Sequence, residues 1–315
     1  MATAHELVLM ESSRSRPALD RRAVAKALSR SADATVSQAL VAVSEPLSGE
    51  LARRIAITGA PGTGKSTLIS QLVRRRLAGA ERLGVLAIDP TSPFSGGAIL
   101  GDRVRMDGLI QDERVFIRSF ASRSAHDGLT DNVADLLAVM DRHGFDEVIL
   151  ETVGVGQTEY AVRVLVDTVV LVLIPESGDQ IQAMKAGLME TADIYVVNKA
   201  DLPNARQVAN DVRAILARSA ARSGWRPAIV ETSSPDAAGI DELSRIIDHH
   251  QRWLAGNRDR SSVFRARRAL QVTGLLFRRV RELVEAGEAA QLDRPVAEIY
   301  AEIVRRMLDD GLRVA

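Results

Sequence analysis

Seven short apolar runs constrain the fold of this chain more than any other feature of its sequence. They are IAIT (55–58), VLAI (85–88), VFI (115–117), VIL (148–150), VVLVLI (169–174), IYVV (194–197) and AIV (228–230). A strand with one solvated face alternates apolar and polar residues, whereas a strand covered on both faces is apolar throughout. Longer stretches with a helical pattern separate the runs. We therefore expect an α/β domain with a doubly wound, mostly parallel sheet.

Helical patterns flank this region at both ends of the chain. Asp20 is suited to cap one helix, and a second helix is expected over 35–44. The strand patterns stop near residue 250; residues 263–286 then predict one long helix, and Pro295 opens another. We predict a helical extension over 1–50, a sheet domain over 51–250 and a helical region over 251–315.

The helix that Pro295 opens carries an apolar stripe that must be buried somewhere. Its members recur at helical spacing: Val296, Ile299, Tyr300, Ile303, Val304, Met307 and Leu308. The stripe can pack on its own domain or form the seam of a homodimer, and the sequence leaves both readings open.

Composition excludes several classes of protein. The 315 residues include 41 basic and 41 acidic side chains, so a net charge of +0 gives no general attraction to nucleic acid or to an anionic membrane. The chain has no cysteine, hence no disulfide framework and no thiolate metal site. Apolar runs fall short of the roughly 20 residues that span a bilayer, and the first residues show no signal pattern. We predict a cytoplasmic protein that binds neither nucleic acid nor membrane.

The sequence GAPGTGKST directly after the first apolar run fits the phosphate-binding pattern G-x-x-x-x-G-K-[ST]. Glycines let the backbone turn tightly enough to aim several N–H groups at phosphate oxygens, and the helix that follows adds its positive end. Lys65 would reach the β- and γ-phosphates, and Ser66 would bind Mg²⁺. The predicted phosphate-binding residues are Gly59, Ala60, Pro61, Gly62, Thr63, Gly64, Lys65, Ser66 and Thr67.

The sequence Asn198-Lys199-Ala200-Asp201 follows the run IYVV and indicates which base is bound. A carboxylate at Asp201 can accept hydrogen bonds from both N–H groups of a guanine edge, and adenine offers no such pair of donors. Asn198 would brace the neighbouring loops, and the stem of Lys199 would lie along the base. A third string, ETSS (231–234), contributes Ser233 and Ser234, whose backbone N–H groups could meet the guanine carbonyl.

Carboxylates at the ends of other strands are candidates for the metal side of the site. Glu151 ends the run VIL, between the phosphate loop and the base motif, and is followed by a loop with glycines at 154 and 156. Asp89 and Asp102 lie in loops after predicted strands and could complete a metal shell through water. The less favoured alternative for each is a plain loop carboxylate.

Several long strings together resemble one family, the methylmalonyl-CoA mutase-associated GTPases, also known as arginine/ornithine transport system kinases. The resemblance covers roughly residues 50–250. It is carried by GAPGTGKST, DPTSPFSGGAILGDRVRM, ETVGVGQTE, SGDQIQAMKAGLMETADIYVVNKAD and ETSS. Most GTP-binding proteins have Asp where this chain has Glu151, and the family pattern ETVGVGQ has Glu there.

What this resemblance implies is a homodimeric GTPase that uses GTP and Mg²⁺. It would act as a chaperone for an adenosylcobalamin-dependent acyl-CoA mutase, gating cofactor loading and protecting the mutase from inactivation. Segments 91–105, 123–130 and 151–160 would sense the nucleotide. Ser66, Asp89, Asp102 and Glu151 would form the Mg²⁺ environment, with Lys65, Glu151 and Gln157 as catalytic residues; Gln157 could instead be a structural loop residue.

The chain departs from the family pattern in one segment. Where the family has a glycine-rich R-G-x-L-G-G-L, this sequence reads RSAHDGL (123–129), so Ser124, His126 and Asp127 bear on switching and on the partner surface. Three other readings stay open: a metallochaperone-type GTPase, a GTP- or ATP-dependent protein kinase of a transport system, and a nucleotide-binding module without turnover.

Overall fold

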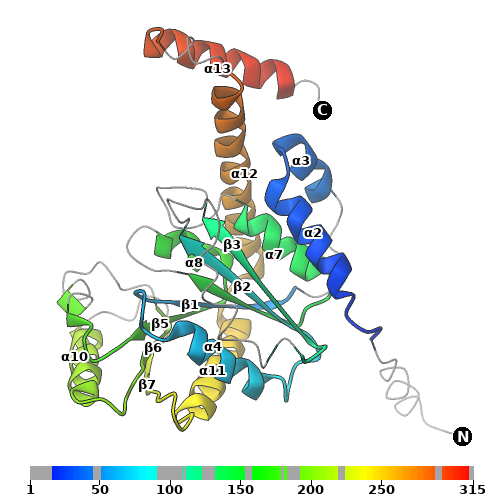
Figure 1. Cartoon of the computed structure of the whole chain (residues 1–315). Coiled ribbons are helices and arrows are strands. Elements are labelled where there is room, and N and C mark those ends of the chain that lie inside the picture. The colour runs from blue at the N-terminus through cyan, green and yellow to red at the C-terminus, as the bar shows by residue number, and fades with distance from the viewer. Residues whose placement is uncertain are drawn as a thin grey trace, which may run out of the picture.

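A seven-stranded sheet in which every neighbouring pair is parallel runs through the molecule (Figure 1). The strand order is β3-β2-β4-β1-β5-β6-β7. All seven apolar runs form strands, which confirms the predicted fold class. The strands are β1 (Arg53–Thr58), β2 (Leu83–Pro90), β3 (Val115–Ser122), β4 (Glu147–Thr152), β5 (Thr168–Leu173), β6 (Ile194–Val197) and β7 (Ala228–Glu231).

The computed structural model describes residues 16–44, 51–90, 109, 111–122, 132–152, 158–178, 181–182, 192–218, 224–287 and 293–311. Side chains of 43, 44, 89, 90, 122, 158–160, 310 and 311 are outside this description. The helices are α2 (Arg21–Asp33), α3 (Val36–Ser44), α4 (Lys65–Arg76), α7 (Val133–Arg142), α8 (Thr158–Leu165), α10 (Ala205–Arg218), α11 (Ile240–Asn257), α12 (Arg260–Glu285) and α13 (Val296–Gly311).

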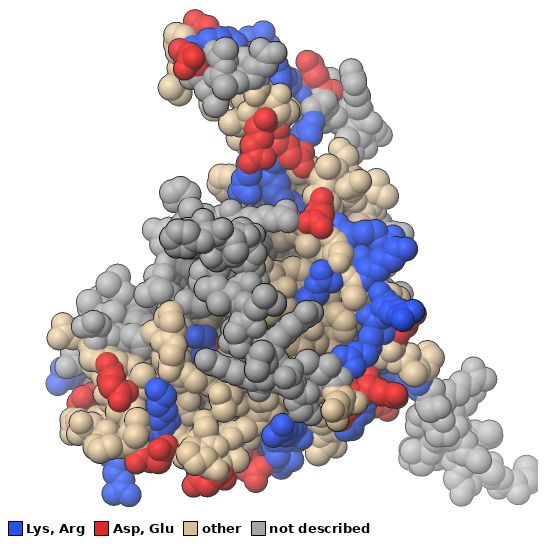
Figure 2. Space-filling model, viewed as in Figure 1, with Lys and Arg blue, Asp and Glu red and all other residues tan. Residues whose placement is uncertain are grey.

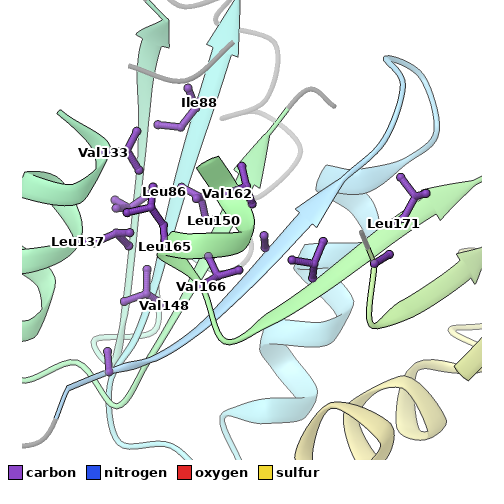
Figure 3. Packing of buried hydrophobic residues seen from close by; sticks show 14 of the residues in the cluster. Leu86, Ile88, Val133, Leu137, Val148, Leu150, Val162, Leu165, Val166 and Leu171 are labelled. Carbon is purple, nitrogen blue, oxygen red and sulfur yellow. The ribbon is translucent and has the colours of Figure 1, made fainter. Parts of the chain in front are cut away.

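Two apolar cores lie on opposite faces of the sheet. In β1, Ile55 and Ile57 face the core shared with α4 and α11, while Ala56 faces the core shared with α2, α7, α8 and α10. Both faces are therefore covered, which is why the strands lack polar alternation. Figure 3 shows the second core, where Leu86 and Leu150 of the sheet lie near Leu137 of α7.

The position of β1 at the centre of the sheet brings distant segments to one edge. It pairs with β4 on one side, where Ile57 is level with Glu151, and with β5 on the other. Because all strands run in the same direction, the loops after β1, β4, β6 and β7 leave from the same edge. Ligands of open α/β sheets bind at this carboxyl edge.

The first amino-terminal helix, α2, packs beside the β3 edge of the sheet, and α3 packs against α12. Asp20 caps α2 as expected, accepting from the N–H of Ala23 at 2.9 Å. Arg118 of β3 donates to the carbonyl of Ala25 at 2.6 Å and to the hydroxyl of Ser29 at 2.8 Å, which ties α2 to the edge strand. Basic side chains gather along α2, whereas acidic and basic groups are mixed over the lower part of the same view (Figure 2).

The two last helices form an arm that leaves the sheet. α12 passes α7 and α8 and continues beyond them, and α13 lies across its far end (Figure 1). α13 rests on α12 through half-buried Ile299 and Ile303, but Val296, Tyr300 and Leu308 are 81%, 70% and 64% exposed. The apolar stripe is therefore buried on one side only.

α11 runs across the proposed domain boundary at residue 250. Its buried residues Leu243 and Ile247 belong to the core beside α4, so packing on the sheet continues through this helix. Within the described part of the chain, none of the helices has the length and apolar character needed to cross a membrane.

Candidate functional site

The loop between β1 and α4 has backbone shapes that only glycine supports well. Gly64, at the amino end of α4, has φ of 84°, and a β-carbon there would lie 2.6 Å from Nδ2 of Asn198. A β-carbon at Gly59 would lie 2.4 Å from the carbonyl oxygen of Val172. These approaches bring the loop against β5 and against the segment after β6. Gly64 carries no side-chain acceptor, so the first N–H groups of α4 keep the capacity to bind an anion.

Lys65 is buried and its ammonium group is held over the loop. Nζ donates to the carbonyls of Gly59 and Ala60, both at 3.0 Å. Thr63 closes the same turn through its hydroxyl, which donates to Ala60 at 2.9 Å. A positive charge and the amino end of a helix are thus directed to one small region, which favours a phosphate group.

Ser66 and Glu151 bring two oxygen ligands together beside the phosphate loop. The Ser66 hydroxyl donates to Oε1 of Glu151 at 2.9 Å, and both residues are buried. The pairing of β4 with β1 sets this distance, because Glu151 is level with Ile57 near the end of β1. A hydroxyl and a carboxylate are hard oxygen donors of the kind that Mg²⁺ prefers.

Asn198 joins the base motif to the phosphate loop. Its Nδ2 donates to the carbonyl of Thr63 at 2.8 Å, and its Oδ1 accepts from the hydroxyl of Thr232 at 3.0 Å. Asn198 and both partners are 1% exposed, so the hydrogen bonds lie out of water. The following Lys199 has φ of 56°, which turns the chain so that Ala200 donates its N–H to Thr232.

Asp201 lies at the surface end of the same group of loops. Its Oδ1 accepts from the Ser233 hydroxyl at 3.0 Å, and Ser233 itself forms an isolated bridge with Ala238. Asp236 lies in the same turn, and hydrogen bonds to its carboxylate lower its pKa. The main one comes from the N–H of Ala238, and the second comes from the Ser233 hydroxyl. Ser233 of the ETSS string therefore orients the carboxylate of Asp201, and Asp201 stays exposed to solvent.

Two further residues position these loops, and sequence reasoning missed both. Gln71 of α4 donates from Nε2 to the carbonyl of Ser234 at 2.7 Å, which links the phosphate-loop helix to the loop after β7. Thr232 was passed over although it stands inside the ETSS string. For Gln71, the sequence offered one signal: it is a polar residue about two turns into the helix that starts at the phosphate loop.

An ion cluster around the buried Arg76 fixes the far end of α4. Arg76 binds Glu147 of β4 through Nη2 and Oε2 at 2.6 Å and Asp248 of α11 at 2.8 Å. Its Nη1 also donates to the carbonyl of Ser244 at 3.2 Å. Because the helix is anchored to both β4 and α11, its amino end is held steady against the loops.

For several predicted site residues, the side chain lies outside the described part of the structure. The backbone of Asp89 lies in β2, two residues beyond Ala87, which is level with Glu151. Its side chain is outside the described part of the structure, as are Asp102, Gln157 and the departing segment 123–129 in full. Of the sensing segments, 91–105 and 123–130 lie outside it too, and 151–160 is described only in part.

The arrangement of the described residues suits a nucleoside phosphate. Along this edge the phosphate loop after β1 lies between Glu151 at the end of β4 and the Asn198–Asp201 segment after β6. Hydrogen bonds among Thr63, Asn198 and Thr232 connect the two ends.

The chain is similar to several known proteins. A family model described as methylmalonyl Co-A mutase-associated GTPase MeaB matches residues 21–289. A putative GTPase of Pyrococcus abyssi is 39% identical over 291 residues, covering 89% of this chain and 88% of its own. The methylmalonic aciduria type A homolog of Mus musculus, described as mitochondrial, is 37% identical over 194 residues, covering 60% of this chain and 47% of its own.

One solved structure, described as an LAO/AO transport system kinase, has the same fold. It aligns with a TM-score of 0.62 and 24% identity, covering 98% of this chain and 100% of that one.

Proposed function

Because the chain belongs to the methylmalonyl-CoA mutase-associated GTPase family, we propose that its carboxyl-edge loops bind and hydrolyse GTP in the service of an acyl-CoA mutase. The resemblance read from the sequence is confirmed, and the chain is a GTPase of this family. The roles of individual residues and the identity of the partner are proposals.

The proposed nucleotide site rests chiefly on the hydrogen bonds of Asn198. They hold the base motif against the phosphate loop, which supports the proposal that one nucleotide contacts both. Residues 59–67 surround the phosphates, and the ammonium of Lys65 moves from its loop carbonyls to phosphate oxygens. Asp201 reads guanine, with Ser233 and Ser234 completing the base pocket and Lys199 beside it.

Ser66 and Glu151 fit a magnesium site. Both supply hard oxygens, and they lie next to the loop that would hold the phosphates. Mg²⁺ bound there would neutralise charge on the phosphate oxygens. Asp89 and Asp102 are proposed to support the site through water, and Gln157 to orient the attacking water. Glu151 holds Ser66 in place by accepting a hydrogen bond from its hydroxyl.

In the proposed role, GTP binding and hydrolysis by this chain control the state of a partner mutase. We assign to this chain the gating of cofactor loading into an adenosylcobalamin-dependent acyl-CoA mutase, and the protection of that mutase. The support is family membership together with the mouse relative's name, which refers to methylmalonic aciduria.

GTP turnover of the purified chain, alone and with a methylmalonyl-CoA mutase, tests this role. We expect slow turnover alone and faster turnover with the mutase. Unchanged turnover and no complex would remove this mutase as the partner and leave the nucleotide site standing. Transfer of labelled phosphate to a protein would favour the kinase reading, and tight binding of a transition metal would favour the metallochaperone reading.

Two substitutions test the nucleotide site itself. Lys65→Ala should abolish productive Mg·GTP binding, and affinity retained within a few-fold would exclude the assigned phosphate contact. Asp201→Asn should reduce the preference for GTP over ATP, because an amide cannot accept from both N–H groups of guanine. An unchanged preference would show that Asp201 does not read the base.

A homodimer through the arm is the remaining part of the proposal. Tyr300 and Leu308 of α13 are mostly exposed, and Leu276 and Phe277 of α12 are 52% and 66% exposed. Apolar area of this kind is stabilised by burial against a second copy. Light scattering should give a dimer mass for the wild type and a monomer mass for Tyr300→Glu/Leu308→Glu; a dimer mass for both would place the contact elsewhere.

A further inference from the structure

A cavity of about 600 Å³ lies at the sheet edge opposite the proposed nucleotide site. Its walls come from the segment entering β1, the loop before β5, the carboxyl-terminal half of α11 and the first turns of α12. The volume falls in the range of small-molecule sites. The nucleotide loops leave from the other ends of these strands, so the proposed GTPase function makes no use of this cavity.

The charges around this cavity are strongly unbalanced. Arg53, Arg258, Arg260 and Arg267 line it, and Asp167 is the one carboxylate among the described lining residues. Asp167 is already engaged: it accepts from Arg267 at 2.7 Å and from the backbone N–H of Arg54 at 2.9 Å. Arg53 is also engaged, because its Nη2 lies 3.6 Å from Oε2 of Glu147. In a chain with a formal net charge of +0, Arg258 and Arg260 carry the local excess of positive charge.

Arg267 is mostly buried in the wall of this cavity, with 15% of its side chain exposed. Burial is the main cause that lowers the pKa of Arg267, and the neighbouring Arg54 and Arg258 lower it further against the opposing effect of Asp167. Arg54 is itself paired with Asp141 at 2.5 Å. Asp167 offsets the repulsion from Arg54 and Arg258, so burial is what lowers the pKa of Arg267. With Asp167 engaged in this way, an anion in the cavity would supply the partner that Arg258 and Arg260 need.

The remaining wall is apolar apart from one amide. Leu254 and Val263 line the cavity together with Phe264, which is 52% exposed although it is a large aromatic residue. Gln251 also lines it, and both polar atoms of its amide are buried without a hydrogen-bond partner among the described residues. An amide in this state costs free energy that a polar ligand or a rearrangement on binding would recover.

We propose that this cavity binds a small organic phosphate, a phosphate monoester with an apolar substituent. Guanidinium groups pair with phosphate oxygens through two N–H groups at once. The excess of more than one positive charge favours a phosphate, which carries about −1.5 to −2, over a carboxylate. Phe264 and Val263 would cover the apolar substituent. The site is separate from the phosphate loop and would make α11 and α12 responsive to a second ligand.

Calorimetric titration with phenyl phosphate tests the proposal on the full chain. Saturating GDP and Mg²⁺ keep the phosphate loop occupied, so any added phosphate binding is counted apart from that site. Intrinsic fluorescence gives a second readout, because the chain has 2 tryptophans and both report on α11. Trp253 belongs to α11, and the ring centroid of Trp225 lies 5.6 Å from that of Trp253. Inorganic phosphate and benzoate serve as the comparison ligands.

Variants inside and outside the cavity distinguish binding in the cavity from binding elsewhere on the surface. Arg258→Gln and Arg260→Gln should each weaken phenyl phosphate binding about tenfold. Arg245→Gln, on an exposed part of α11 outside the cavity, is the matched control and should bind like the wild type. Phe264→Ala should weaken phenyl phosphate but leave the weaker binding of inorganic phosphate unchanged.

Each outcome bears directly on the proposal. One phenyl phosphate per chain, tighter than inorganic phosphate or benzoate and sensitive to Arg258 but not to Arg245, supports it. It is overturned by absent binding, by equal loss in Arg245→Gln, or by equal affinity for inorganic phosphate. Benzoate binding as tightly as phenyl phosphate would overturn the choice of phosphate. A failure of GDP to bind would contradict the proposed nucleotide site instead, and the comparison of arginine variants would still stand.

Discussion

Asn198→Ala gives the sharpest test of how the site is held together. The substitution removes two side-chain hydrogen bonds and leaves the carbonyl of Thr63 and the hydroxyl of Thr232 buried without their partner. An unsatisfied buried group costs about 1–3 kcal/mol, and the Thr232 hydroxyl can rotate to reduce its share. We expect the free energy of unfolding to fall by about 2–4 kcal/mol, a large part of the ~5–15 kcal/mol available to a folded protein.

Urea unfolding followed by fluorescence measures this loss. The midpoint should fall while the slope with denaturant stays constant, since the same surface is exposed on unfolding. GDP affinity should fall as well, because the phosphate loop and the base motif are no longer joined. A double-mutant cycle with Thr232→Val should give a coupling free energy of about 1 kcal/mol.

Asn210→Ala is the matched control, since Asn210 is exposed on α10 and accepts from Arg213 at the surface. It should change the free energy of unfolding by no more than about 0.5 kcal/mol. The reasoning is refuted if Asn198→Ala unfolds within the same margin of the wild type and binds GDP as tightly.

Three other predictions follow from neighbouring contacts. Gly64→Ala should also lower GDP affinity, and combined with Asn198→Ala it should cost less than the sum, because its β-carbon would meet the same amide; additive losses would contradict this. Gln71→Met should reduce the preference for GTP over ATP a few-fold by releasing the carbonyl of Ser234, measured by nucleotide competition, and an unchanged preference would count against it. The free energy of unfolding should decrease as pH falls through about 6.5, because burial lowers the pKa of His250 below its ordinary 6.5 and the unfolded chain then takes up the extra proton. Urea midpoints at several pH values check this, and His250→Gln should flatten the profile.

Sequence patterns identified the strands and the local motifs because those depend on near neighbours. An uninterrupted run such as IYVV reports burial on both faces, and GAPGTGKST reports a turn between a strand and a helix. Glu151 could be placed beside the phosphate loop because parallel strands end at the same edge. The seven strands and the long helix over 263–286 were correctly predicted on this basis.

Contacts between distant segments could not be predicted in the same way. The bond from Gln71 to Ser234 joins residues 163 positions apart, and nothing in either segment alone indicates the other. The arginine-lined cavity depends on how α11 meets α12 and on the chain entering β1. The extent to which α13 is buried could not be predicted either. One apolar stripe on α13 is compatible with burial on α12 and with exposure.

The central place of β1 also determines when the protein can acquire its ligand during synthesis. β1 is followed at once by the phosphate loop, but its sheet neighbours are β4 and β5, and β5 ends only at Leu173. At about 5–20 residues per second, the ribosome needs on the order of ten seconds between the two. Until then the loop emerges without the strands that shape it. A nascent chain stalled before β5 should therefore fail to retain nucleotide, even though its phosphate-binding sequence is complete.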